Sequence, residues 1–165
     1  MKSVLVAGIG NIFKGDDGFG VAVARHLAGE TLPTGVEVVD FGIRALDLVY
    51  ALRDGYHAAI LIDTVQRGEP PGTLYVIEPE PPPTAADDAN DLLLSPHEMD
   101  PDKVLRLASL LGGACGQVVL VGCEPESLGD DEFGAEGLSP PVAAAVGRAA
   151  AEVERLASAF IEEVS

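Results

Sequence analysis

Short apolar runs alternate with stretches of helical periodicity along the chain, and this alternation restricts the fold more than any other feature. The apolar runs predict strands over Val4–Ala7, Val36–Val39, Ala59–Ile62, Thr73–Ile77 and Gln117–Val121. The helical patterns predict helices over Phe19–Ala28, Ala45–Leu52, Asp102–Leu111 and Pro140–Glu163. Strands that are separated by helices favour an α/β fold, with a mostly parallel sheet covered by helices on both faces.

The third and fourth predicted strands are the exception, because no helix separates them. We therefore expect the fourth strand to lie antiparallel at an edge of the sheet, with a spatial strand order of 2-1-3-5-4. With 165 residues and no internal repeats, the chain is expected to form a single domain over residues 1–165. Ligands of such sheets bind beyond the carboxyl ends of the strands, near the point where the strand order reverses.

The charge of the chain excludes one class of partner. The sequence has 27 acidic residues against 10 Lys and Arg, a net charge of −17, which repels phosphate backbones and anionic lipid. We therefore expect neither nucleic acid nor membrane as a partner. Eight acids lie in Glu78–Asp102 and six in Glu124–Glu136, and neither segment contains Lys or Arg. These acidic segments are either solvated loops or a rim that attracts a cation or a basic peptide.

The N-terminal apolar run is too short for a signal-peptide core, and no stretch of about 18 uncharged apolar residues occurs. The sequence therefore predicts a soluble cytoplasmic protein. Its two cysteines, Cys115 and Cys123, are too few for a disulfide scaffold and lack the spacing of a zinc site.

The most informative segment is the glycine-rich run from Gly8 to Gly20, which directly follows the first predicted strand. A dinucleotide-binding fingerprint would require glycine where Phe13 stands. A phosphate-binding P-loop would require Lys14 to be followed by Ser or Thr at the next position. Asp40, at the end of the second predicted strand, is where a ribose-binding acid would lie, so nucleotide binding stays open as an alternative.

Two carboxylates are expected to meet at the carboxyl edge of the sheet. Asp17 lies near the end of the glycine-rich run, and Asp63 closes the third predicted strand. Asp16 is expected to act only as a helix cap and dipole partner. His97, in the loop after the fourth strand, is a candidate third ligand, because two carboxylates and one imidazole would leave open positions on a metal ion.

These residues resemble those of the hydrogenase maturation proteases. The resemblance rests on Gly8-x-Gly10-Asn11 with Asp16-Asp17-Gly18-x-Gly20, on Asp63, on Ser95-Pro96-His97, on Gly42 and on Gly122-x-Glu124-Pro125. It covers nearly the whole chain, although the Pro- and Asp-rich stretch Glu78–Asp91 departs from the family pattern. The family implies a five-stranded α/β/α sandwich and an endopeptidase, grouped with the aspartic-type enzymes, that removes the C-terminal extension of a nickel–iron hydrogenase large-subunit precursor.

The resemblance also implies a nickel site built from Asp17, Asp63 and His97. Cleavage would proceed only once the precursor carries nickel, so that the substrate brings the metal to the protease. Two mechanisms are open at this stage. Nickel would polarise the scissile carbonyl or activate a water, or it would only position the peptide while Asp17 or Asp63 acts as general base.

Substrate contacts are expected from the segment that follows the second strand, namely from Asp40, Gly42 and Arg44. Arg44 either pairs with Asp40 or Asp47, or grips a carbonyl or carboxylate of the precursor with its guanidinium.

Two other functions compete with the protease. Cys123 with His97 as base would give a cysteine hydrolase, whereas no Gly-x-Ser-x-Gly motif supports a serine hydrolase. A non-catalytic protein that binds a metal or a partner is the other alternative.

Overall fold

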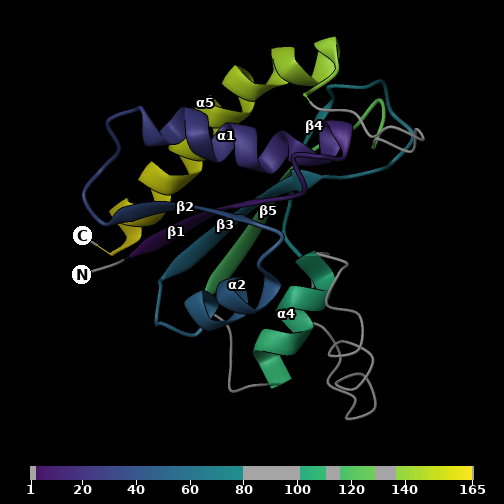
Figure 1. Cartoon of the computed structure of the whole chain (residues 1–165). Helices are drawn as coiled ribbons and strands as arrows, with labels where there is room; N and C mark the ends of the chain where they lie inside the picture. The colour runs from purple at the N-terminus through teal and green to yellow at the C-terminus, as the bar shows by residue number, and fades with distance from the viewer. Residues whose placement is uncertain (1–2, 80–100, 111–115, 129–136, 165) are drawn as a thin grey trace.

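The structure is a computed structural model that describes residues 3–79, 101–110, 116–128 and 137–164. Its strands form one sheet in the order β2-β1-β3-β5-β4, as predicted (Figure 1). The strands are β1 (Val4–Ile9), β2 (Val36–Gly42), β3 (Ala58–Thr64), β4 (Leu74–Ile77) and β5 (Gln117–Cys123). The helices are η1 (Gly15–Gly18), α1 (Phe19–Ala28), α2 (Ala45–Leu52), α4 (Pro101–Leu110) and α5 (Pro140–Glu163).

The strand directions follow from the connections. β1 pairs in parallel with β2 and β3, and β3 pairs in parallel with β5. β4 pairs antiparallel with β5 at the edge, as expected for a strand that no helix separates from its predecessor. The parallel strands therefore share one carboxyl edge, and both chain termini lie near the opposite, amino edge (Figure 1).

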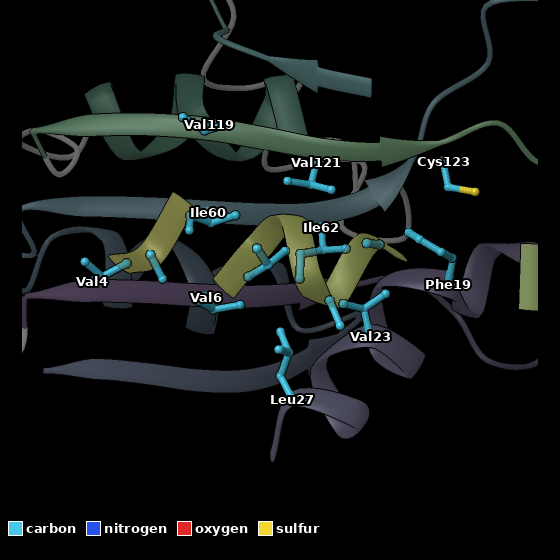
Figure 2. Close-up of a cluster of buried hydrophobic side chains, with 14 of the residues drawn as sticks. Val4, Val6, Phe19, Val23, Leu27, Ile60, Ile62, Val119, Val121 and Cys123 are labelled. Atoms are coloured by element: carbon cyan, nitrogen blue, oxygen red, sulfur yellow. The ribbon is translucent and has the colours of Figure 1, made fainter. Parts of the chain in front are cut away.

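Two aliphatic cores pack on the two faces of the sheet. On one face, α1 and α5 cover the even-numbered residues of β1 and β3, such as Val4, Val6, Ile60 and Ile62 (Figure 2). On the other face, the buried residues of α2 and α4 pack with the odd-numbered ones, including Leu5, Ala7, Ala59 and Leu61. This alternation is that of a central strand buried on both sides.

The strands continue further toward the carboxyl edge than their apolar runs predict. β2 extends past Asp40 to Gly42, because the backbone N–H of Gly10 donates to the carbonyl of Gly42 over 3.0 Å, beyond a bulge in the β1–β2 pairing. β3 extends to Thr64, since Asp63 and Thr64 still pair with β5. Asp40 and Asp63 therefore lie within the last residues of their strands rather than just after them.

Gly20 lets α1 begin directly against the sheet edge. A Cβ atom at this position would lie 2.1 Å from the carbonyl oxygen of Ile62 and 2.3 Å from that of Ile9. Only glycine allows so close an approach, and it brings the loop before α1 onto the ends of β1 and β3. Among the helices of the described residues, none is long and apolar enough to cross a membrane.

Candidate active site

The loop that follows β1 holds Asp17 at the carboxyl edge of the sheet. Gly10 has a φ of 139°, and its position allows no side chain, since a Cβ would lie 1.8 Å from the carbonyl oxygen of Asp17. The chain then returns so that the backbone N–H of Asn11 donates to Oδ2 of Asp17 over 2.9 Å. Asp17 is half-buried, and its carboxylate is thus fixed by the backbone of its own loop.

Asp16 has a different role from the one predicted. It caps neither η1 nor α1. The residue is only 1% exposed, and its carboxylate accepts hydrogen bonds from residues that lie 110 to 123 positions later in the chain. Oδ2 accepts from the backbone N–H groups of Glu126 and Ser127 and from the hydroxyl of Ser139, at 2.8 to 3.0 Å. Oδ1 accepts from the backbone N–H of Ser139 at 2.7 Å.

Ser139 precedes α5, a position where a serine side chain commonly caps the helix. Its hydroxyl serves Asp16 instead and makes no capping hydrogen bond. Burial raises the pKa of Asp16, yet the hydrogen bonds from Ser139, Ser127 and Glu126 outweigh burial and leave this pKa below its usual value. Asp16 is therefore ionised and joins the Asp17 loop to the segment after β5 and to the start of α5.

Asp63 lies at the end of β3, next in the sheet to the strand that precedes the Asp17 loop. The residue is 5% exposed, and its Oδ1 accepts a hydrogen bond from the backbone N–H of Thr64 at 2.8 Å. As an odd-numbered strand residue it belongs to the face covered by α2 and α4. η1, which contains Asp17, contacts β3. Both carboxylates thus belong to one edge of two adjacent strands.

His97 lies outside the described residues, four positions before α4 begins at Pro101. In the part of the chain that the structure describes, no three His, Cys, Asp or Glu side chains gather closely enough to hold a metal ion. The predicted set of Asp17, Asp63 and His97 therefore stays a prediction.

A cleft of about 380 Å³ opens beside Asn11, the residue that holds the Asp17 carboxylate. It runs between the loop after β1, the start of α1 and the segment after β2. Its lining includes all three predicted substrate contacts, Asp40, Gly42 and Arg44. Gly42 has a φ of 55°, which turns the chain from β2 toward α2 and which glycine adopts without strain.

Arg44 forms an ion pair with Asp47 at 3.2 Å, which is the first of the two roles expected for it. Toward Asp40 it contacts the backbone rather than the carboxylate: Nη2 donates to the carbonyl of Asp40, and Nε to that of Phe41 at 3.2 Å. The carboxylate of Asp40 faces Arg25 instead, at 3.5 Å. Arg44 therefore shapes the wall of the cleft by bracing the turn after β2.

Glu124 is a structural residue whose role sequence reasoning did not assign. Its buried Oε1 accepts from the backbone N–H groups of Arg67 and Glu69 and from the hydroxyl of Tyr75. The Tyr75 hydrogen bond is the main cause that lowers the pKa of Glu124. This one carboxylate therefore organises the connection between β3 and β4. The Gly122-x-Glu124-Pro125 motif was the only sequence signal for it.

Cys123 does not suit the cysteine-hydrolase alternative. Its side chain is fully buried in the core under α1 and α5. Burial raises the pKa of the thiol to about 11, and the negative charge of Asp16 adds to this effect. A thiol that stays protonated and cannot be reached is not a nucleophile.

Comparison with known proteins decides between the remaining classes. Residues 21–156 match the family model for hydrogenase maturation proteases. The chain belongs to the hydrogenase maturation protease family. The predicted endopeptidase class is therefore confirmed, and the nucleotide-binding and non-catalytic alternatives lose their support.

Relatives of the chain agree with this family. The hydrogenase expression/formation protein HupD of Rhodobacter capsulatus is 34% identical over 99% of this chain and 75% of its own length. HoxM of Cupriavidus necator is 36% identical over 77% of this chain and 61% of its own. The chain thus spans three fifths to three quarters of these two maturation proteins.

Solved structures of maturation proteases share the fold. A hydrogenase 2 maturation peptidase from a Thaumarchaeota archaeon is 34% identical, with a TM-score of 0.67 over 92% of this chain and 96% of its own. The hydrogenase maturating endopeptidase HybD from Escherichia coli is 26% identical, with a TM-score of 0.69 over 92% of this chain and 89% of its own. The α/β fold predicted from the sequence is therefore that of the family.

Proposed function

We propose that this protease removes the C-terminal extension of a nickel-loaded hydrogenase large-subunit precursor, and that the nickel is recognised as part of the substrate. The observation that carries the proposal is the position of Asp17 and Asp63 at one edge of two adjacent strands, with Asp17 held by Asn11, which lines a cleft together with Asp40, Gly42 and Arg44. The proposal places the reaction in the cytoplasm, where the precursor chain is synthesised.

The donor chemistry fits nickel carried by the substrate. Carboxylates with one imidazole form a mixed oxygen and nitrogen set that leaves positions open for substrate groups. Oδ2 of Asp17 takes the Asn11 hydrogen bond, and Oδ1 accepts none from the described residues. His97 lies outside the described residues, four positions before α4, which packs on the Asp63 face of the sheet. Asp17, Asp63 and His97 are the residues that would contact the substrate's nickel.

Asp17 and Asp63 then have separate roles. Asp63 is almost fully buried and held by Thr64, which suits a fixed anchor. Asp17 is half-buried, so water reaches it, and we assign to it the general base. With Oδ1 directed to nickel, Oδ2 of Asp17 would take a proton from the water that attacks the scissile carbonyl; the C–N bond then breaks, and the proton passes to the amine of the released extension. When bound, the substrate's nickel would supply Lewis-acid polarisation of that carbonyl.

The cleft beside Asn11 would receive the peptide segment next to the scissile bond. Its walls offer backbone groups of the bulge after Asp40 and a braced guanidinium at Arg44. A pocket of about 380 Å³ has room for a few side chains, which suits recognition of a short extended segment.

The proposal is tested by incubating the protein with hydrogenase large-subunit precursor that is loaded with nickel or free of it. Trimming of the loaded form alone is the expected result. Asp63→Asn should abolish trimming, whereas Asp54→Asn, at an exposed carboxylate beyond the end of α2, should not change it. Equal trimming of both precursor forms would overturn the nickel requirement. Full activity of folded Asp63→Asn would overturn the assigned site.

A further inference from the structure

In the part of the chain that the structure describes, most exposed large apolar side chains lie in the segments that form the cleft or continue from it. Seven such side chains are exposed among the described residues, and five of them lie in two short segments. The five are Ile12, Phe13, Ile43, Leu46 and Tyr50, between 38% and 63% exposed, and we call them the apolar rim. The other two, Val76 and Val164, lie on β4 and at the end of α5.

The apolar rim is continuous with the proposed substrate cleft. Ile12, Phe13 and Ile43 line the cleft directly. Ile12 and Phe13 also line a second pocket of about 340 Å³, together with Gly137 and Leu138 before α5.

The rim extends from the cleft along the outer side of α2. Leu46 and Tyr50 are four positions apart, so they share one side of the helix. Leu48, Val49 and Leu52 form the opposite, buried side of the helix. The sheet therefore does not need Leu46 and Tyr50 for its own packing.

Two ion pairs border the rim, while Lys14, directly after Phe13, is exposed. Arg44 pairs with Asp47 at 3.2 Å, and Arg25 with Asp40 at 3.5 Å. Covering these two ion pairs leaves little unbalanced charge to desolvate at their positions. Apolar side chains bordered by paired charges are typical of the core and rim of a protein–protein interface.

We propose that the apolar rim docks the folded body of the hydrogenase large-subunit precursor, beside the segment that is cut. This rests on the proposed function. The cleft holds only a few side chains, whereas a specific protein–protein contact buries roughly 800 Å² on each partner. Contact with a protein substrate must therefore extend past the cleft, and the rim is the apolar surface that adjoins it. The partner surface is correspondingly apolar and carries few charges.

The test compares two double variants that remove equally exposed apolar side chains. Leu46→Ser with Tyr50→Ser should raise KM for the nickel-loaded precursor roughly tenfold and leave kcat unchanged, because buried apolar anchors carry much of the binding energy. Val76→Ser with Val164→Ser should change neither constant. Thermal unfolding and the oligomeric state are measured for both variants, so that loss of fold or of self-association is seen directly.

Each other outcome has a defined meaning. An unchanged KM in the Leu46 and Tyr50 variant, or an equal rise in the control variant, would overturn the docking surface. Conversion of a wild-type dimer into a monomer by the rim variant, without a change in KM, would overturn it in favour of a second copy of this chain. Wild-type protein that binds the precursor through the rim without cutting it would overturn the proposed function and leave the docking surface standing.

Discussion

The hydroxyl of Ser139 donates a hydrogen bond to the carboxylate of Asp16 over 2.8 Å, although 123 positions separate the two residues. The same carboxylate also binds the backbone N–H groups of Glu126, Ser127 and Ser139. The residue directly before the proposed general base is therefore a junction between three segments. Its loss should affect both stability and the geometry of the neighbouring loop.

Asp16→Asn should lower the free energy of unfolding by about 2–4 kcal/mol, because the amide nitrogen faces donors that it cannot satisfy in a buried site. Ser139→Ala removes one donor and should cost about 1 kcal/mol. Urea unfolding at neutral pH measures both values. Wild-type stability in Asp16→Asn would show that the junction does not hold these segments together.

Gly20→Ala should destabilise the protein and slow precursor cleavage, since its Cβ would clash with the carbonyl oxygens of Ile62 and Ile9. The matched control is Gly147→Ala in α5, where a Cβ would meet no atom within 4 Å. There alanine should stabilise the helix by about 0.5–1 kcal/mol. Thermal unfolding and cleavage rates are compared for the pair. Similar effects of the two substitutions would contradict the proposed close approach.

Tyr75 and Glu124 should give stability a dependence on alkaline pH. Burial first, and then the hydrogen bond to Glu124, raise the pKa of Tyr75 from 10.0 to about 12. The raised pKa means that the unfolded chain loses this proton first. The contribution is therefore complete below pH 10 and is lost as the pH rises to about 12. Urea unfolding from pH 8 to pH 12 should show this decline in the wild type and a smaller one in Tyr75→Phe. Parallel curves would contradict it.

Arg44→Ala should raise KM for the precursor several-fold while leaving the fold intact, because its guanidinium braces the turn that forms the cleft wall. The ion pair with Asp47 is exposed and should contribute about 0–1 kcal/mol to stability. Arg44→Lys keeps the charge without the planar fork, so it should behave nearly like Arg44→Ala if bracing matters. Unaltered cleavage kinetics in both variants would leave Arg44 with surface electrostatics only.

Helix positions followed from the sequence because their patterns are local. The predicted bounds of α1, α2 and α5 agree with the structure, and α4 is shifted by one residue. The strand ends could not be predicted from the sequence, because the backbone pairing between strands continues past the end of each apolar run. Gly42 and Thr64 belong to their strands only through partners on β1 and β5.

The candidate site was predictable to a smaller extent. A strand-end position and a glycine-rich loop were enough to place Asp63 and Asp17 at one edge. The role of Asp16 was not predictable, because its hydrogen-bond partners lie 110 to 123 positions away and no local sequence pattern indicates them. His97 lies outside the described residues, so its part in the site stays a prediction.

The junction at Asp16 has a consequence for how such a protease can diversify. Ser127 and Ser139 are attached to the same carboxylate, so the stretch of chain between them starts and finishes at one fixed point. Lengthening a loop whose ends are already joined costs little, since closure entropy grows only with the logarithm of length. A change of chain length between these two serines should therefore leave the catalytic loop in place.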